Sequence, residues 1–258
     1  MRRAFAALAL VLLATAPAVA QDVTPLQLYQ TGKYDEAIKA GLAANDADGF
    51  AVAARAELAE EMMREAPCLD CLKRAEAYAR KAIAADPKQA EGRIYLAATL
   101  GYQTRIIGLV AAKFKGFAGE AKSNLDMALA NHPDNPWVLA AMGGWNIAVV
   151  KGGGATLAAW LYGASTEQGL KDFARAMTID PQNIAIRFQY ALSLSAFDRK
   201  TYAKEIGAAL QATVSGKPRT AYETLMQGWA LNLLNAFKQG DWKNYDALVR
   251  HYQRYPSS

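Results

Sequence analysis

Apolar residues recur along the chain every three to four positions, within long windows of Ala, Leu, Lys, Glu and Gln. This spacing is typical of amphipathic helices. Alternating runs of Val, Ile and Thr, which mark half-buried strands, do not occur. After its first twenty residues the chain is therefore expected to be all-helical. The expected helices span residues 24–31, 34–44, 48–66, 69–85, 88–103, 117–131, 136–150, 166–178, 182–197, 199–213, 218–238 and 241–254.

The first twenty residues have a different pattern. Arg2 and Arg3 precede an apolar stretch, and Ala18-Val19-Ala20 ends it with small residues. This order predicts a secretory signal peptide over residues 1–20 that is cleaved before Gln21. The alternative, an uncleaved anchor, is disfavoured because the apolar run is too short to cross about 30 Å of hydrocarbon. We expect a soluble, exported and periplasmic chain without a transmembrane segment after cleavage.

A pattern of small residues and proline recurs three times in one register. A small residue is followed by another seven positions later and by proline five positions after that. Nine and ten positions beyond each proline come a large and a small residue. Because small residues let two helices approach closely, the repeat predicts successive packed helix pairs. The copies are Ala75, Ala82, Pro87, Leu96 and Ala97; Ala121, Ala128, Pro133, Met142 and Gly143; and Gly169, Ala176, Pro181, Tyr190 and Ala191.

This arrangement resembles the tetratricopeptide repeat family, whose helix pairs carry a large-small pair in the first helix and small-small-proline around the second. Residues 30–38 and the turn at residues 240–242 are similar to the family's turn into its second helix. The resemblance covers most of residues 24–254. It implies an all-α fold, an α-solenoid of about six antiparallel helix pairs, forming one domain over residues 21–258.

The repeat is longer than that family's usual 34 residues. Pro87 and Pro133 are 46 residues apart, and Pro133 and Pro181 are 48 apart, so two pairs carry inserted segments at residues 104–116 and 151–165. Long inserts within such helices are similar to the layout of the regulator of microtubule dynamics family. Asn135-Pro136-Trp137 and Met142-Gly143-Gly144-Trp145 carry this second resemblance. A microtubule function is not expected of an exported chain.

Charge removes one class of partner. The whole chain has a net charge of +5, and removal of residues 1–20 takes away two arginines and no acid, which leaves +3. A nearly neutral chain lacks the basic surface that nucleic acid binding requires. We therefore expect no nucleic acid partner.

Cys68 and Cys71 form the only cysteine pair, at the start of an expected helix. In an exported protein the first expectation is a structural disulfide. A reduced or inert pair and a redox-active thiol are the alternatives, because a helix N-terminus lowers a thiol pKa. A zinc site would need two further ligands.

Other chemical motifs are missing from the sequence. Residues 151–154, Lys-Gly-Gly-Gly, lack the ending of a phosphate-binding loop and are expected to form a flexible turn before a short apolar helix over residues 156–162. His132 and His251 are the only histidines, and neither lies in a nucleophile or metal motif. No catalytic residue, no bound metal and no cofactor are expected, and the chain is not expected to be an enzyme.

The resemblance to tetratricopeptide repeats implies that the first helix of each pair lines a concave face. The residues expected there are mostly apolar, which favours an amphipathic helix, an extended peptide or an apolar small ligand. Alternatively, the inserts fill the groove. The expected partner-binding residues are Ile94, Tyr102, Trp137, Ile147, Phe188 and Leu192.

Three functions remain open. The first is an exported scaffold that binds a protein or peptide partner in its concave face. The second is an accessory protein for an apolar or acidic small molecule, which gains support if the low-charge segment 137–165 lines an open cavity. The third is a thiol redox protein using Cys68 and Cys71. The insert at residues 105–117, which mixes apolar side chains with cations, either lies over the solenoid or touches an anionic membrane surface.

Overall fold

The computed structural model describes residues 23–256, which form helices and no strand, so the expected all-α fold is confirmed. The signal peptide predicted at residues 1–20 lies outside the described residues. The helices are α1 Pro25–Gln30, α2 Tyr34–Ala44, α3 Ala47–Met63, α4 Leu69–Ala85, α5 Ala90–Ile107, α6 Leu109–Phe114, α7 Phe117–Asn131, α8 Pro136–Gly153, α9 Ala155–Tyr162, α10 Thr166–Ile179, α11 Ile184–Asp198, α12 Ala203–Ser215, α13 Ala221–Gln239 and α14 Trp242–Tyr252.

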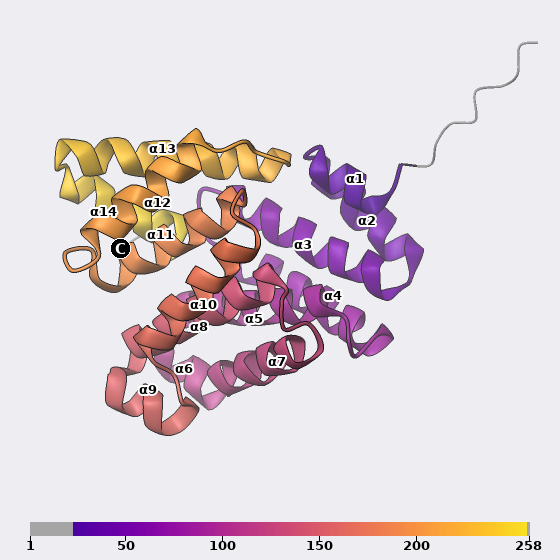
Figure 1. The fold of residues 1–258 in the computed structure, drawn as a ribbon. Coiled ribbons are helices and arrows are strands. Elements are labelled where there is room, and N and C mark those ends of the chain that lie inside the picture. Colours follow the sequence, from indigo (N-terminus) through magenta and orange to yellow (C-terminus); the bar gives the residue numbers. More distant parts are fainter. Residues whose placement is uncertain (1–22, 257–258) are drawn as a thin grey trace, which may run out of the picture.

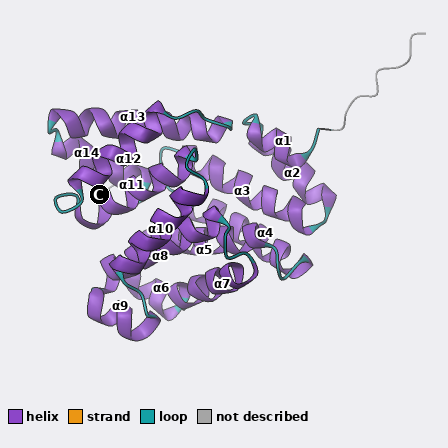
Figure 2. Cartoon of the chain, in the orientation of Figure 1, coloured by secondary structure: helices purple, strands orange, loops and turns teal. Residues whose placement is uncertain are grey.

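The helices form six neighbouring pairs in chain order (Figure 1). The pairs are α1 with α2, α3 with α4, α5 with α7, α8 with α10, α11 with α12, and α13 with α14. The short helices α6 and α9 are inserted within the third and fourth pairs. Short loops join most of these elements, as Figure 2 shows. The arrangement agrees with a helical solenoid that carries two inserts.

The three proline turns between pairs share one structure. The residue before each proline ends a helix by donating its backbone N–H to the carbonyl of a fully buried alanine four positions earlier. Two positions after the proline, an amide side chain accepts a backbone N–H and caps the next helix. Each turn therefore ends one pair and starts the next. The capping residues are Gln89, Asn135 and Asn183.

Small residues set the separation of the helices, as the repeat predicts. A Cβ placed on Gly143 of α8 would lie 2.9 Å from the carbonyl oxygen of Gly169 on α10, and 2.7 Å from Cδ2 of Phe173. These distances are shorter than van der Waals contact. Any larger residue at Gly143 would therefore push the two helices apart.

The low-charge segment 137–165 does not form one long helix. It folds into α8 and the separate short helix α9, which are divided by Gly154 at a φ of +78°. Among residues 23–256, no helix combines the length and apolar character that a bilayer-spanning segment needs.

The two ends of the solenoid meet, so the described chain forms a closed ring. Helix α13 contacts α1, and Tyr222 of α13 packs against the hydrophobic core of α1 to α3. Beyond α14, Arg254 Nε lies 3.2 Å from Oε1 of Glu61 on α3. Arg254 Nη1 also donates to the Arg64 carbonyl at 2.7 Å. Arg254 and Glu61 are both fully buried.

Residues 253–255, here called the C-terminal strap, tie this closure to the middle of the chain. The Gln253 side chain donates to the Leu192 carbonyl of α11 at 3.1 Å. Arg105 of α5 donates to the Gln253 carbonyl at 2.9 Å. The strap therefore ties α3, α5 and α11 together.

Cys68 and Cys71 lie at disulfide distance, with their Cα atoms 5.3 Å apart. Cys68 is the N-cap residue of α4, and its Sγ accepts the Cys71 backbone N–H at 3.2 Å. The backbone N–H of Cys68 donates to Oε1 of Glu61 at 3.1 Å. The pair therefore fixes the turn between α3 and α4 beside the ring closure.

Candidate functional site

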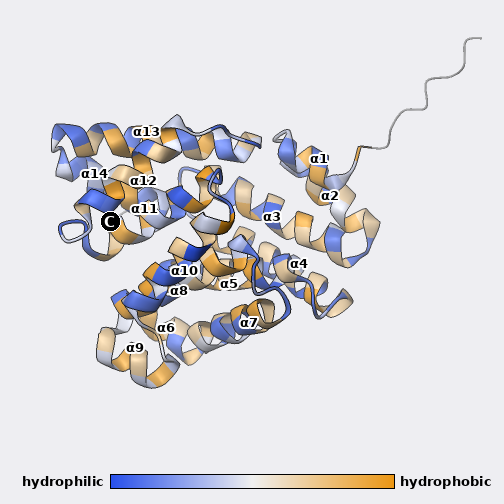
Figure 3. Cartoon of the chain, viewed as in Figure 1, coloured by the Kyte–Doolittle hydropathy of each residue, from blue (hydrophilic) through white to orange (hydrophobic). Residues whose placement is uncertain are grey.

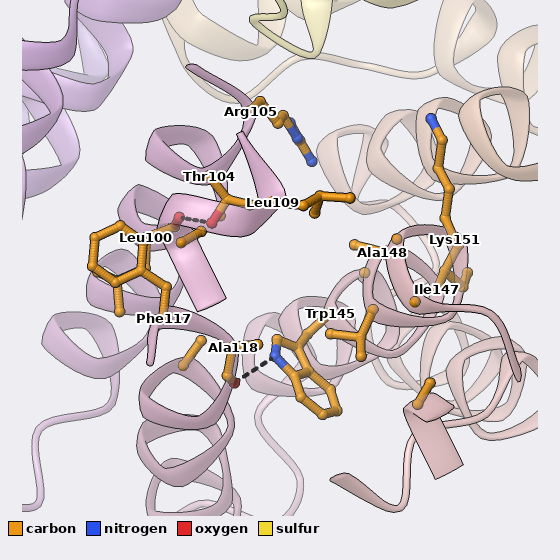
Figure 4. Close-up of a pocket in the computed structure, with 18 of the residues that line it drawn as sticks. Leu100, Thr104, Arg105, Leu109, Phe117, Ala118, Trp145, Ile147, Ala148 and Lys151 are labelled. Atoms are coloured by element: carbon orange, nitrogen blue, oxygen red, sulfur yellow. Dashed lines mark hydrogen bonds between the residues drawn. The ribbon is translucent and has the colours of Figure 1, made fainter. Parts of the chain in front are cut away.

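A cavity of about 460 Å³ lies between the two inserts and the long helices that carry them. Its walls come from α5, α7 and α8, and the short helices α6 and α9 complete them. Leu109 of α6, Leu157 and Leu161 of α9, and Trp145 of α8 line it (Figure 4 shows Leu109 and Trp145). We call this space the insert cavity.

Both short helices begin after a glycine turn. The Gly108 N–H bonds to the Thr104 carbonyl at 2.9 Å, and the Gly154 N–H bonds to the Val150 carbonyl at 2.8 Å, so each glycine ends a long helix. The φ angles of Gly108 and Gly154, +86° and +78°, are rarely accessible to other residues. The same type of turn therefore places α6 beside α5 and α9 beside α8. The insert cavity lies between these two pairs of helices.

Two polar side chains of the cavity wall donate to backbone carbonyls of the same wall. Trp145 Nε1 donates to the Ala118 carbonyl at 3.1 Å, and the Thr104 hydroxyl donates to the Leu100 carbonyl at 2.8 Å (dashed in Figure 4). Because these donors are already satisfied, they leave an apolar surface toward the cavity.

Three cationic side chains and no acidic one line the insert cavity: Arg105, Lys113 and Lys151. None of them belongs to an ion pair found within residues 23–256. Arg105 and Lys151 lie toward one end of the cavity and Trp145 toward the other (Figure 4). The Tyr255 ring centre lies 5.8 Å from the Arg105 guanidinium and 5.4 Å from the Lys151 amine. The cavity therefore combines apolar walls with a cationic end.

A second cavity, of about 290 Å³, lies on the inner face of the ring and is called the central cavity. Gly101, Gly144 and Ala148 line both cavities, so only small side chains separate them at these positions. Apart from Arg105, no residue of the two inserts lines the central cavity, and neither α6 nor α9 contributes to it. They build the insert cavity instead of filling the groove.

Charges in the central cavity have both signs. The Arg55 guanidinium lies 4.3 Å from the Tyr29 ring centre, and Arg55 Nη1 lies 3.9 Å from Oε1 of Glu91. Burial raises the pKa of Tyr29 and of Tyr95, although Arg55 opposes the shift. These phenols therefore stay neutral at ordinary pH, and the charged residues that line the cavity are Arg55, Arg105, Glu91 and Glu223. The two cavities differ clearly in electrostatic character.

The six helix pairs and two inserts can be compared with known families. The sequence profile of the family described as regulator of microtubule dynamics protein 1-3 matches residues 28–238. The chain belongs to this family. The match begins within α1 and covers the rest of the first pair, the next four helix pairs, both inserts and most of α13. The search of curated proteins finds no relative of this chain.

The sequence-predicted partner-binding residues of this family member are only partly brought together. Ile94, Tyr102 and Trp137 line the central cavity. Ile147 lines the insert cavity and is nearly fully buried. These four positions therefore face two spaces of different chemistry.

Phe188 and Leu192 require a correction. They are 1% and 2% exposed and lie in the hydrophobic core, not on an accessible concave face. The Phe188 ring centre lies 6.1 Å from that of Trp229 on α13 and 6.4 Å from that of Tyr252 on α14. The last helix pair folds over α11 and covers both residues.

Other lining residues were not among the predicted set. Arg55 lies on α3, and repeat register assigned no concave positions to that helix. Tyr255 reaches the insert cavity from the strap, which the sequence assigned to no site. Arg105 and Lys151 lie in segments of the sequence that contain no acidic residue. This absence of acids is the signal that could have located the cationic end of the cavity.

Proposed function

We propose that this family member is an exported, non-catalytic binding protein, built on tetratricopeptide-type helix pairs, that holds an amphiphilic anion in its insert cavity. One observation carries the proposal: the low-charge segment 137–165 lines an open cavity whose only charged residues are cations. This is the condition under which the sequence favours a small-molecule ligand over a protein scaffold.

The cavity chemistry sets the class of ligand. Apolar walls stabilise a hydrocarbon portion by roughly 25 cal/mol per Å² removed from water. Arg105 and Lys151 at one end favour a carboxylate or phosphate head group, because charge-assisted hydrogen bonds are the stronger ones. A volume of about 460 Å³ lies within the usual range of ligand sites, about 300–1,000 Å³. The proposed ligand has an anionic head near Tyr255 and an apolar body toward Trp145.

A protein or peptide partner on the concave face is the second candidate. It is supported by the shared position of Ile94, Tyr102 and Trp137 on the central cavity. One helical turn, about 5.4 Å long and about 10 Å wide, occupies roughly 420 Å³. The central cavity holds about 290 Å³. A peptide there would be a short extended segment, and Trp137→Ala would reduce its capture.

Export is the third part of the proposal. The charged start, the apolar stretch and the Ala18-Val19-Ala20 ending support cleavage before Gln21. Mass spectrometry of the protein secreted by a Gram-negative host should give an N-terminus at Gln21, in the periplasmic fraction. An intact Met1 in the membrane fraction would contradict export as a soluble protein.

The ligand proposal is tested first by native mass spectrometry of the freshly purified protein, which should retain an organic anion. Direct binding is then compared for dodecanoate and dodecanol, which differ only in the head group. We expect dodecanoate to bind about tenfold more tightly, which corresponds to roughly 1.4 kcal/mol. Equal affinities would contradict an anionic head group.

Two variants test the location. Arg105→Gln with Lys151→Gln should remove most of the preference for dodecanoate, and Ala148→Phe should weaken both ligands by filling the cavity. The matched controls lie on other helices: Lys204→Gln with Lys243→Gln, and Ala208→Phe, all at exposed positions. Unchanged binding in both cavity variants would overturn the proposed site.

Insulin reduction by the purified protein would instead favour the thiol redox function of Cys68 and Cys71.

A further inference from the structure

The two inserted helices expose large apolar side chains that the insert cavity does not use. Phe114 of α6 is 90% exposed, Val110 is 73% exposed, and Trp160 of α9 is 79% exposed. None of the three lines the insert cavity. The ribbon of α9 is coloured mostly toward the hydrophobic end of the scale in Figure 3. Nearly half of the large hydrophobic residues that are exposed in the described chain lie on these two short helices.

The two helices belong to the same end of the molecule. Leu109 of α6 lies against the end of α8, because a Cβ on Gly152 would be 3.2 Å from Leu109 Cδ2. Helix α9 follows directly after that end of α8, and both short helices border the insert cavity (Figure 1). Val110, Phe114, Lys115 and Trp160 are here called the insert face.

The charged residues of the two inserts are all cations. The sequence contains no Asp or Glu between Glu91 and Glu120, and none between Asp134 and Glu167. Glu120, at the nearest end of α7, is already paired with Arg80 at 2.6 Å. The exposed cations Lys113 and Lys115 therefore lie beside Phe114 without a neighbouring acid in the sequence of either insert. A negatively charged surface complements this arrangement.

We propose that the insert face docks this protein on an anionic lipid surface. Trp160 and Phe114 enter the interfacial region of the bilayer, where aromatic side chains are favoured, and Lys115 lies over the anionic head groups. A second copy of the chain fits less well. Helices of six and eight residues are about 9 and 12 Å long, too short to supply the ~800 Å² per partner that a stable dimer buries.

The experiment is co-flotation of the purified protein with vesicles of phosphatidylcholine alone, or with about one third phosphatidylglycerol, at low and high salt. We expect binding to the anionic vesicles only, weakened by salt. Phe114→Ser with Trp160→Ser should lower the partition coefficient by about tenfold or more. Lys115→Gln should lower it roughly fivefold. Because none of these residues lines the insert cavity, dodecanoate binding should be unchanged in these variants, which separates this inference from the proposed function.

The controls are exposed apolar and cationic residues on other helices. Leu231→Ser with Ile179→Ser removes two exposed apolar residues elsewhere, and Lys243→Gln removes a distant cation. Both should bind like wild type. In a second readout, lipids with brominated acyl chains should quench tryptophan fluorescence, and Trp160→Phe should remove that quenching while the protein still floats. Absence of binding to anionic vesicles, or equal binding by the double serine variant, would overturn the inference. So would a dimer in sedimentation that depends on Phe114 and Trp160.

Discussion

Arg254 closes the ring by forming a fully buried ion pair with Glu61, 193 residues earlier in the sequence. Glu61 Oε1 also accepts the Cys68 N–H, so this one oxygen joins the strap to the turn between α3 and α4. Glu61 Oε2 and Arg254 Nη2 make no hydrogen bond within the described residues. One oxygen of Glu61 and one nitrogen of Arg254 are therefore buried without a hydrogen-bond partner among the described residues.

Arg254→Ala should destabilise the protein by about 3–5 kcal/mol, because it leaves the Glu61 carboxylate buried without a countercharge. Glu61→Leu combined with Arg254→Met should recover most of that loss, since removal of both charges also removes their desolvation cost. Urea unfolding followed by circular dichroism measures both. Lys243→Ala, a change of the same charge at an exposed site, serves as control. A loss below about 1 kcal/mol for Arg254→Ala would show that the closure is not needed.

Gly143→Ala should cost about 1–3 kcal/mol, because the added methyl group meets the Gly169 carbonyl and the Phe173 ring where α8 crosses α10. Gly228 on α13 is the matched control, because nothing lies within 4 Å of a Cβ added there. Gly228→Ala should raise stability by about 0.5–1 kcal/mol. Thermal unfolding of the two variants would contradict the close crossing if their shifts had the same sign.

Tyr245 gives a prediction for alkaline pH. Burial raises its pKa to about 12, while a hydrogen bond of 2.6 Å with the Ser195 hydroxyl opposes the shift. The folded pKa lies above the unfolded value of about 10, so this contribution to stability is complete below pH 10 and is lost as the pH rises through 12. Tyr245→Phe should be less stable than wild type by about 1 kcal/mol at pH 9. Between pH 9 and pH 12, the free energy of unfolding of the variant should fall by about 2–3 kcal/mol less than that of wild type. Parallel stability profiles would contradict the raised pKa.

Cys68→Ser with Cys71→Ser should destabilise the protein by about 2 kcal/mol, because the bridge closes a loop of only four residues. A reducing agent should lower wild-type stability to the same value and leave the variant unchanged. Serine at position 68 keeps a side-chain acceptor for the N-terminus of α4, so loss of the cap does not add to the effect. No response of wild type to reductant would show that the pair is already reduced.

The fold followed from local features of the sequence. Ala82 and Pro87, and their counterparts in the later copies, mark both the tight helix contact and the turn that follows, so one register locates helix pairs along much of the chain. Helix α6 was missed, because six residues are too few for a periodic pattern. The start of α5 was placed two residues early, since Gln89 caps the helix after the proline turn.

The site was less accessible to sequence reasoning. Repeat register located Ile94, Tyr102 and Trp137 on an inner cavity, because that register records which side of a helix faces inward. It carried no information about Phe188, which is covered by helices that follow much later in the chain. Contacts between the first and last helix pairs, such as that of Arg254 with Glu61, depend on the curvature of the whole solenoid. No local sequence pattern therefore predicts them.

The ring closure also has a consequence for the order in which the chain folds. Helices α3 and α4 are neighbours in the sequence and can pair early, whereas the contact between Glu61 and Arg254 closes a loop of 193 residues. Contacts between such distant residues form slowly, because the entropy of loop closure is lost before the contact is gained. Closure of the ring is therefore expected to be the last step of folding.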